Sequence, residues 1–389
     1  MKKIHLHPGK EKRLLQGHRW VFSNEISDRL ADYEPGSWVR VFSSKGVPLG
    51  SGYINPQSLI TVRLACPPGQ EPTREYFSDL VSKAAERRKE LYYPGSDCYR
   101  VIYGESDGLP GLVVDRYGKV LVYQMTTLGM SRIEELIQEI LIDVLKPETL
   151  VFRHDAPVRA LEGLSLEKGI AFGPVPDPSW VHVDGLDFRV DTLEGQKTGL
   201  FLDQRDNRKA IRHWANGRRV LDLFCYNGGW GLAAASAGAQ EVIGVDQSVD
   251  AIAQAWDNAE RNQLDDRCRF MSEEAFHFLK TAERASFDLI ILDPPAFAKT
   301  RSALPQARKG YTDLNRRALL ALKPGGILVS CSCSYHLSDD MSREVLLLAA
   351  RASGRQLRLL EARGQALDHP PLLAMPETRY LKCVITEVL

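Results

Sequence analysis

The chain has 389 residues, enough for two or three domains, and its hydrophobic content of 44% allows each domain a core of its own. Fifty basic residues balance fifty acidic ones, so no overall positive charge indicates a nucleic-acid partner. The seven cysteines are odd in number and form no CxxC pair, and the nine histidines show no metal-ligand spacing, which argues against a disulfide framework and a zinc ribbon. Neither a signal peptide nor an apolar run of membrane-spanning length is present, so we expect a cytoplasmic protein with no membrane partner.

Residues 1–68 are predicted to form a small β-barrel, because short strand candidates alternate there with Gly and Pro. The strand candidates are Trp20–Phe22, Trp38–Phe42, Leu49–Tyr53 and Ile60–Leu64. The amino terminus is locally basic, and Trp20, Phe22 and Trp38 stand near it. Phosphate contacts and base stacking could both come from such a surface, although most of these aromatic side chains are expected in the barrel core. A linker rich in proline follows at residues 66–72.

Residues 69–182 are predicted to form a small mixed α/β domain. A charged helix is expected from about Arg74 to Leu91. An amphipathic helix is expected from about Ser131 to Leu145, because apolar side chains recur there at helical spacing. The strand candidates are Gly111–Asp115, Val120–Gln124, Thr149–Phe152 and Ile170–Phe172.

Strand and helix candidates alternate through residues 183–389. The strand candidates are Arg219–Phe224, Glu241–Val245, Arg269–Met271, Asp288–Leu292 and Gly326–Val329. The helical stretches between them are Gly231–Ala237, Ser248–Asn262 and Asp313–Leu322. This alternation predicts a Rossmann-like, doubly wound and largely parallel sheet. In the usual strand order of such sheets, the first, fourth and fifth strands are neighbours.

A glycine-rich turn follows the first of these strands and indicates a ligand site. Gly228, Gly229 and Gly231 would let a ligand approach the backbone at the start of a helix. Their spacing departs from GxGxxG, and no GKS or GKT follows, which argues against a P-loop. Asp246 ends the second strand and could accept hydrogen bonds from both ribose hydroxyls, while Glu274 follows the third strand and could lie at an adenine edge. The order and interval of these residues favour a nucleoside site over an ordinary βαβ unit with capping acids.

Two motifs close the fourth and fifth strands, Asp293-Pro294-Pro295 and Ser332-Cys333-Ser334. Ligands bind at the carboxyl ends of the strands in a parallel sheet, so a carboxylate and a thiol are offered to the same crevice. An acid together with a soft nucleophile suits covalent activation of a pyrimidine ring better than hydride or phosphoryl transfer.

With these motifs the chain resembles S-adenosylmethionine-dependent methyltransferases, and most of all the large-subunit ribosomal RNA cytosine-C5 methyltransferases with an N-terminal PUA domain. The resemblance covers essentially the full length. It is carried by Gly17–Phe22, Glu105–Gly111, Gln196–Arg205, Asp293–Phe297, Lys309–Tyr311, Ser332–Ser334 and Asp368–Pro370. It implies a PUA β-barrel that binds RNA at residues 1–68, a middle α/β domain at 69–182, and a Rossmann-like methyltransferase domain at 183–389.

The resemblance also implies S-adenosylmethionine as the cofactor. The implied cofactor contacts are Thr198, Gln204, Arg205, Asp222, Phe224, Tyr226, Asn227, Gly228, Gly229, Asp246, Gln247, Ser248, Glu274 and Asp293. The glycine loop would hold the methionine portion and Asp246 the ribose. Thr198, Gln204 and Arg205 would close the site from the front. The family often carries Asp at the position of Glu274, which would lie near the adenine.

The implied chemistry begins from C5 of cytosine, which is too weak a nucleophile until a thiolate adds to C6. The resemblance implies Cys333 as this thiolate and Asp293 as the group that hydrogen-bonds or protonates N3. The sequence names no clear base for the C5 proton. Cys331 would share a face of an extended strand with Cys333, but it lies farther from the crevice and is expected in the core. Ala296 stands where some related enzymes carry a second cysteine, which implies catalysis by one cysteine.

The implied substrate contacts are Pro294, Pro295, Phe297, Lys299, Arg308, Lys309 and Tyr311. The basic residues among them are expected in a loop beside the active site, where they would meet substrate phosphates. The expected partner is large-subunit (23S) rRNA or its assembly intermediate, and the resemblance suggests a homodimer. Two other functions stay open. One is methylation of another position, such as guanine N7, which needs no thiol; the other is a noncatalytic RNA-binding assembly factor, which would not bind cofactor.

Overall fold

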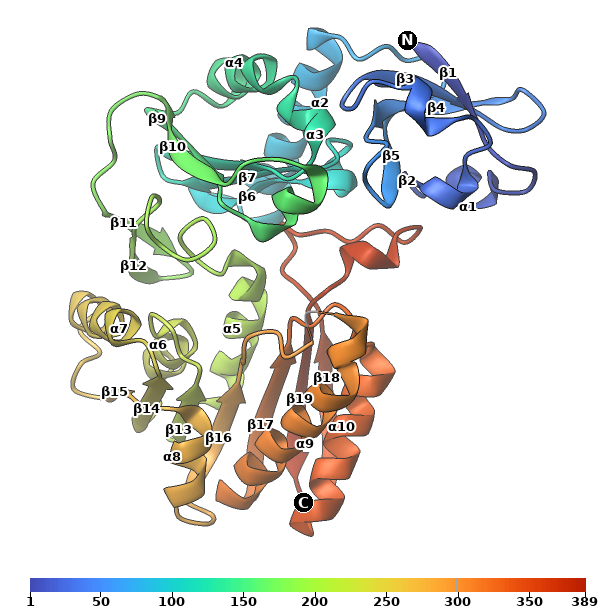
Figure 1. The fold of residues 1–389 in the computed structure, drawn as a ribbon. Coiled ribbons are helices and arrows are strands. Elements are labelled where there is room, and N and C mark those ends of the chain that lie inside the picture. The colour runs from blue at the N-terminus through green and yellow to red at the C-terminus, as the bar shows by residue number, and fades with distance from the viewer. Residues whose placement is uncertain (299) are drawn as a thin grey trace. The chain divides into compact units, whose positions relative to one another are not determined.

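The computed structural model describes residues 1–298 and 300–389 and forms two compact units (Figure 1). The first unit comprises Met1–His182, Val190–Leu202 and Leu367–Thr378, and the second comprises Val183–Arg189, Asp203–Ala366 and Arg379–Leu389. The third domain, expected as the unbroken range 183–389, is therefore interrupted twice by segments that belong to the first unit. Lys299, one of the implied substrate contacts, lies outside the described residues.

The first unit begins with a five-stranded sheet whose order is β1-β3-β4-β5-β2. Its strands are β1 (Lys2–His5), β2 (Trp20–Phe22), β3 (Trp38–Phe42), β4 (Pro48–Ile54) and β5 (Ile60–Cys66), and a short helix α1 spans Lys12–Leu15. Ile, Val and Leu side chains from these strands share one core. Strand β1 was not predicted from the sequence, because its four residues include a single apolar one and its pairing with β3 is not local.

Polar contacts fasten this sheet to the middle of the chain. The Trp20 indole Nε1 donates to Glu105 Oε1 at 2.8 Å, and Arg63 Nη1 donates to the same oxygen at 3.0 Å. The buried Tyr53 hydroxyl donates to the Pro110 carbonyl. The polar edge of Trp20, one of the aromatic residues considered for RNA stacking, is thus already used inside the protein.

A second five-stranded sheet, of order β10-β9-β8-β7-β6, lies beneath helices α2 and α4 in Figure 1. The elements are α2 (Arg74–Glu86), β6 (Cys98–Tyr103), β7 (Leu112–Tyr117), β8 (Val120–Met125), α3 (Leu128–Ser131), α4 (Glu134–Leu145), β9 (Thr149–His154) and β10 (Glu167–Phe172). The charged helix continues as a wider π-helical turn over Arg87–Tyr92. The single helix expected over residues 131–145 is interrupted, because Ile133 leaves the helical region with φ −115° and ψ 25°.

The returning segment Leu367–Thr378 is bound to this sheet by buried charges. Asp368 accepts a hydrogen bond from the Arg100 backbone N–H at 2.8 Å and contacts His369 Nδ1 at 2.7 Å. The Arg88 guanidinium, fully buried, pairs with Asp107 at 2.6 Å and donates to the Asp368 carbonyl at 3.1 Å. The Asp-His-Pro motif therefore anchors the segment Leu367–Thr378 to the first unit.

The second unit is built on a seven-stranded sheet of order β15-β14-β13-β16-β17-β19-β18. Its strands are β13 (Arg219–Leu223), β14 (Glu241–Asp246), β15 (Cys268–Ser272), β16 (Phe287–Leu292), β17 (Leu322–Ser332), β18 (Leu357–Arg363) and β19 (Lys382–Val388). The first five are parallel, and β19 and β18 extend the sheet in antiparallel fashion. The expected adjacency of β13, β16 and β17 is confirmed.

Helices cover this sheet, and α9 and α10 lie in front of β17 and β19 in Figure 1. The helices are α5 (Arg205–Ile211), α6 (Gly229–Ser236), α7 (Val249–Arg261), α8 (Ala275–Thr281), α9 (Leu304–Ala321) and α10 (Asp339–Ser353). A two-stranded sheet of β11 (Ser179–Val183) and β12 (Leu186–Val190) precedes them. Elements β11, β12, β18, β19, α5, α8 and α10 were not predicted from the sequence.

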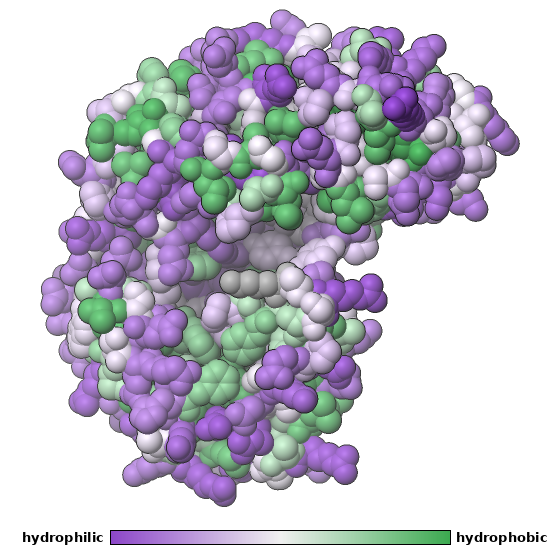
Figure 2. All heavy atoms as spheres, in the orientation of Figure 1, coloured by the Kyte–Doolittle hydropathy of each residue, from purple (hydrophilic) through white to green (hydrophobic). Residues whose placement is uncertain are grey.

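Hydrophilic residues (purple) dominate the face drawn in Figure 2, and apolar residues (green) form smaller groups between them. Large exposed apolar side chains such as Leu15, Leu59 and Leu91 are scattered along the sequence, as on most proteins. Within the described parts of the chain, no helix is both long and apolar enough to cross a membrane.

Candidate active site

The glycine-rich turn after β13 is tightly folded. Phe224 and Tyr226 take positive φ values of 63° and 50°, and Gly228 reaches 82° just before α6 begins. A Cβ atom on Gly228 would meet the Phe270 ring at 3.0 Å, and one on Gly231 would meet the Val242 side chain at 2.9 Å. The glycines are therefore needed for the turn to pack against β14 and β15, which leaves backbone facing the carboxyl edge of the sheet.

Two buried polar atoms in this turn lack a hydrogen-bond partner among the described residues. They are Asp222 Oδ1 and Asn227 Nδ2. The other carboxylate oxygen of Asp222 accepts from the Gly231 N–H at 2.8 Å. The pKa of Asp222 is raised to about 8, mainly by burial and also by the charges of Asp293 and Asp246, while the hydrogen bond from the Gly231 N–H lowers it. An unsatisfied acceptor and an unsatisfied donor fit the ammonium and carboxylate of an amino acid, as found in S-adenosylmethionine.

Asp246 lies at the end of β14 and is held from two sides. Its Oδ2 accepts from the Tyr226 N–H at 3.0 Å, and its Oδ1 accepts from the Ser248 N–H at 3.0 Å. Each carboxylate oxygen has a second lone pair, so both can still accept from ribose hydroxyls. Ser248 caps α7 through its hydroxyl, and Gln247 between them is exposed.

Glu274 is exposed and acts as the N-cap of α8. Its Oε2 accepts a hydrogen bond from the His277 N–H at 2.7 Å. The capping role, which the sequence left open as the alternative to an adenine contact, is thus observed.

The three residues expected to close the site from the front have different surroundings. Thr198 belongs to the first unit, where its buried hydroxyl donates to Asp115 at 2.6 Å. Arg205 is buried in a bidentate ion pair with Asp184, with both N–O distances at 2.8 Å. Of the three, Gln204 is the one whose side chain reaches Asp293, the acid of the Asp-Pro-Pro motif.

Asp293 follows β16 and is clamped by two neutral donors. Gln204 Nε2 donates to its Oδ1 at 2.9 Å, and Trp230 Nε1 donates to its Oδ2 at 2.9 Å. Trp230 was not predicted as a site residue, although it stands inside the glycine-rich turn. The backbone of Trp230 lies at the glycine turn, and its indole Nε1 reaches Asp293. Trp230 therefore connects the cofactor side of the site with Asp293.

Cys333 follows the end of β17, and Asp293 follows the end of the neighbouring strand β16, where Leu292 pairs with Ser330. Cys333 is half-buried, whereas the other six cysteines are buried. Its Sγ lies 4.0 Å from the Pro294 carbonyl oxygen. Cys331 is 2% exposed, faces Cys383 across the strands, and its pKa is raised well above the ordinary value by burial. Cys331 therefore has the surroundings of a core residue.

Hydroxyl groups fix the segment that carries Cys333. Ser332 Oγ donates to the Tyr311 hydroxyl at 3.0 Å, and the Tyr311 hydroxyl contacts Ser334 Oγ at 2.8 Å. Ser334 Oγ also accepts from the Ala298 N–H at 3.2 Å. The Phe297 ring stacks on Tyr311 with centroids 4.4 Å apart. Tyr311 is 2% exposed, so it offers little surface of its own to a substrate. Its ring instead supports the Phe297 ring by stacking.

The expectation of a basic loop after the Asp-Pro-Pro motif is wrong for two of its residues. Arg308 and Lys309 lie in α9, because Pro305 occupies the first turn of a helix that continues to Ala321. Arg308 pairs with Glu344 of α10 at 2.7 Å, and Lys309 is exposed. Pro294 is buried and Pro295 is exposed.

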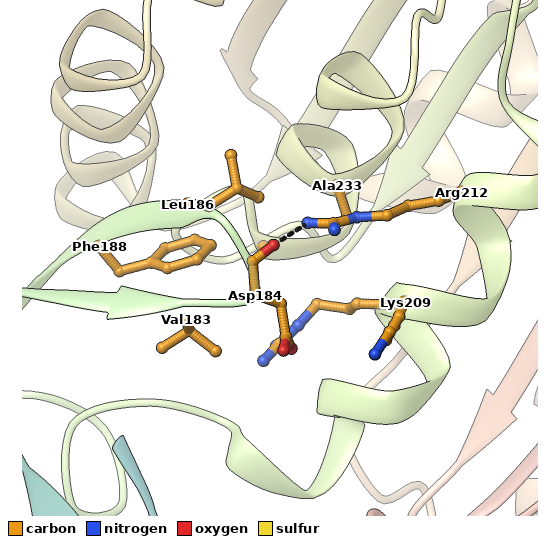
Figure 3. A pocket seen from close by; sticks show the side chains of 9 residues that line it. Val183, Asp184, Leu186, Phe188, Lys209, Arg212 and Ala233 are labelled. Atoms are coloured by element: carbon orange, nitrogen blue, oxygen red, sulfur yellow. Dashed lines mark hydrogen bonds between the residues drawn. The ribbon is translucent and has the colours of Figure 1, made fainter. Parts of the chain in front are cut away.

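A small hollow lies beside the glycine turn (Figure 3). It is lined by Val183, Asp184, Leu186, Phe188, Arg208, Lys209, Arg212, Gly229 and Ala233. Arg212 donates to the Asp184 carbonyl at 2.7 Å, as the dashed line shows. Burial lowers the pKa of Arg208, whose Nη1 would lie 3.2 Å from a Cβ atom on Gly229. This cation is a further candidate to hold a cofactor carboxylate, and it was not among the residues predicted from the sequence.

Comparison with known proteins agrees with this geometry. The S-adenosylmethionine-dependent methyltransferase family matches residues 153–371, and a PUA-like domain matches residues 4–66. A Streptococcus mutans protein solved as a candidate SAM-dependent methyltransferase has a TM-score of 0.85 at 21% identity over 100% of both chains. A second structure, of a candidate methyltransferase complexed with SAH, has a TM-score of 0.86 at 21% identity over 100% of both chains. At this identity the likeness shows the fold.

The sequence relatives are nearer. Ribosomal RNA large subunit methyltransferase I of Pseudoalteromonas atlantica is 36% identical over 392 residues, covering 100% of this chain and 99% of the relative. The protein of the same name from Photobacterium profundum is 39% identical over 389 residues, covering 97% of each chain. The chain belongs to the S-adenosylmethionine-dependent methyltransferase family, with S-adenosylmethionine as its cofactor, and to the group of relatives named ribosomal RNA large subunit methyltransferase I.

Proposed function

We propose that this enzyme forms 5-methylcytosine in large-subunit rRNA through a covalent bond between Cys333 and C6 of the target cytosine. The names of the full-length relatives support the rRNA substrate. The observation that carries the cytosine chemistry is the pair of adjacent strand ends, with Asp293 after β16 and Cys333 after β17. A methyltransferase acting on guanine N7 has no use for a thiol at this place.

The thiolate of Cys333 adds to C6, and the electron pair of the C5–C6 double bond becomes available at C5. S-adenosylmethionine supplies the methyl group that C5 receives. A base then removes the C5 proton, the C5–C6 double bond re-forms, and the sulfur leaves C6 with its bonding pair. Cys333 is regenerated, so the enzyme needs no external reductant or oxidant.

Asp293 is suited to hold the base during this addition. Gln204 and Trp230 each donate a hydrogen bond to one of its oxygens, which orients the carboxyl group. As a carboxylic acid, Asp293 can donate its proton to N3 of cytosine, and its other oxygen can accept from the exocyclic amine, as negative charge builds on the ring. The neutral donors on either side fix the orientation of the carboxylate without competing for its charge.

The cofactor half of the proposal uses the carboxyl ends of β13 and β14. Asp246 would accept from the ribose hydroxyls. Asp222 and Asn227 would receive the ammonium and the carboxylate of the methionine portion, which supplies partners for their unsatisfied atoms. Arg208 beside Gly229 would add a positive charge to the carboxylate side.

The decisive experiment is mechanism-based trapping. RNA containing 5-fluorocytosine should form a stable adduct with the enzyme and S-adenosylmethionine, because fluorine cannot leave as a proton does. The adduct is scored on a denaturing gel and located by peptide mapping. Cys333→Ala should abolish both the adduct and turnover, whereas Cys331→Ala, the matched control on the same strand, should retain substantial activity. Methylation by Cys333→Ala at the wild-type rate would instead support a reaction without a thiol, such as guanine N7 methylation.

A further inference from the structure

A buried lysine lies next to the segment that carries Cys333. Lys382 is the first residue of β19, pairs in register with Ser332, and is 4% exposed. Its Nζ donates to the Ser334 carbonyl at 2.9 Å and to the Tyr380 carbonyl at 3.0 Å. Because Cys333 stands between Ser332 and Ser334, the ammonium is held at the nucleophile's own turn.

This ammonium has hydrogen-bond partners but no carboxylate partner among the described residues. Asp339, the acid that acts on it, is paired with Arg379 at 3.1 Å. Neutral carbonyls satisfy two of its three N–H groups, yet they cannot cancel its charge. A buried cation without a counterion is costly, so such a residue is expected where a negative charge forms during function.

The surroundings indicate which negative charge this is. Burial lowers the pKa of Lys382, while Asp339 and Cys333 act in the opposite direction and Arg379 adds to the lowering. An RNA phosphate is an unsuitable counterion, because a side chain with 4% exposure cannot be reached from solvent. The Tyr311, Ser332 and Ser334 hydroxyls, which fix the segment that carries Cys333, have no charge. Besides Asp339, the group whose negative charge acts on Lys382 is the thiolate of Cys333.

We propose that Lys382 is the electrostatic partner of Cys333: its ammonium favours the thiolate over the thiol and so prepares the nucleophile before substrate binds. This inference rests on the proposed role of Cys333 as the nucleophile. Lys382 acts through Cys333 and touches neither substrate nor cofactor, so it is a positioning residue. It completes the reaction site from β19, an element whose antiparallel pairing with β17 places it directly beside Cys333.

The test is the pH dependence of alkylation of Cys333 in the intact enzyme, without RNA. Iodoacetamide modification is followed by peptide mapping, with Cys333→Ser as the background. In the wild type the rate should reach half its maximum well below about pH 8.5, the ordinary midpoint of a free thiol. In Lys382→Met the midpoint should move upward, so that the rate at pH 7 falls about tenfold, and Lys382→Arg should restore most of it.

Three controls separate charge from structure. Above about pH 10 all variants should be alkylated at similar rates, since every thiol is then ionised and only access matters. Lys323→Met, near the start of β17 where Lys323 pairs with Asp288 at 2.8 Å, should leave the profile unchanged. Iodoacetate, an anion, should gain relative to iodoacetamide in the wild type and lose that advantage in Lys382→Met.

A wild-type midpoint at or above about pH 8.5 would overturn the inference without any variant, as would coincident profiles for the wild type and Lys382→Met. If the profiles behave as expected but fluorocytosine RNA gives no adduct, the lysine–thiolate pair stands and the proposed function fails. If the adduct forms on Cys333 although Lys382→Met leaves the thiol's profile unchanged, the function stands and the role of Lys382 fails.

Discussion

The two halves of the sheet in the second unit form their parts of the site by different means. On the cofactor half, β13 and β14 end in carboxylates that are held by backbone N–H groups from the glycine turn and from the first turns of helices. On the reaction half, Asp293 follows β16 and Cys333 follows β17, and side chains from distant parts of the sequence hold Asp293 and Ser332, the residue before Cys333. Backbone contacts suit a cofactor shared by many enzymes, while side-chain contacts suit a reaction that one group of enzymes performs.

The largest effect on activity is expected from replacing Asp293, the acid of the reaction half. Asp293→Asn should lower kcat by about 10²–10⁴-fold, the usual range for loss of a positioned acid or base, because an amide cannot accept on both edges or carry the proton. Calorimetry should show S-adenosylmethionine binding close to the wild-type value. A variant that loses cofactor affinity and kcat together would mean that Asp293 belongs to the cofactor half.

The next effect is expected at the ribose site of the cofactor half. Asp246→Ala should weaken S-adenosylmethionine binding by roughly 1.5–3 kcal/mol, because the ribose hydroxyls lose a charged acceptor. Glu274→Gln is the matched control, since Glu274 is exposed and spends one oxygen as a helix cap, and its effect on affinity should be much smaller. If calorimetry shows that both variants lose the same affinity for S-adenosylmethionine, the assignment of Asp246 as the ribose ligand and Glu274 as only a helix cap is wrong.

The cofactor half also makes a prediction about pH. The Asp222 pKa of about 8 lies above the ordinary value of 3.8. Between about pH 4 and pH 8 the folded protein therefore keeps a proton that the unfolded chain has lost, so this group makes stability fall as pH rises. Asp222→Asn removes the dependence and should gain roughly 1–3 kcal/mol over the wild type by pH 8 in urea unfolding without cofactor.

Asp288→Asn is the control of opposite sign for that experiment. Burial raises the Asp288 pKa, but hydrogen bonds from Lys323 and the Arg219 N–H outweigh it, so the net shift is downward. The ionised Asp288 thus stabilises the fold above about pH 4, and this contribution is lost as the pH falls further. A wild type and an Asp222→Asn variant with parallel pH curves would show that Asp222 is ionised in the folded protein.

The contrast between the halves also explains how much the sequence could predict. The glycine turn, Asp246 and the strand ends were predictable, because each depends on residues close together in the chain. The sequence did not predict the hydrogen-bond partners of Trp230, Gln204 and Lys382, because these partners depend on which strands become neighbours. Strands β18 and β19 were missed for the same reason.

Local pattern also misled at particular residues. Arg308 and Lys309 were expected in a polar loop, yet they lie in α9, whose buried residues Ala307, Tyr311 and Leu314 follow helical spacing. Thr198 stays a predicted cofactor contact, and the structure adds that its hydroxyl donates to Asp115, a residue much earlier in the sequence. This partner was invisible until the chain was folded.

The smallest effect is expected where the two halves meet, at Trp230. Its backbone belongs to the glycine turn, while its Nε1 donates to Asp293, so Trp230→Phe should keep the turn and remove the hydrogen bond. We expect kcat to fall by about 3–10-fold, which corresponds to roughly 0.5–1.5 kcal/mol for one hydrogen bond, with cofactor affinity nearly unchanged. Trp256→Phe on α7, where the ring packs on Phe270, is the matched control for loss of an indole. Because the missing donor acts only on Asp293, the double variant Trp230→Phe with Asp293→Asn should be no slower than Asp293→Asn alone, and additive losses would show that Trp230 acts through the cofactor turn instead.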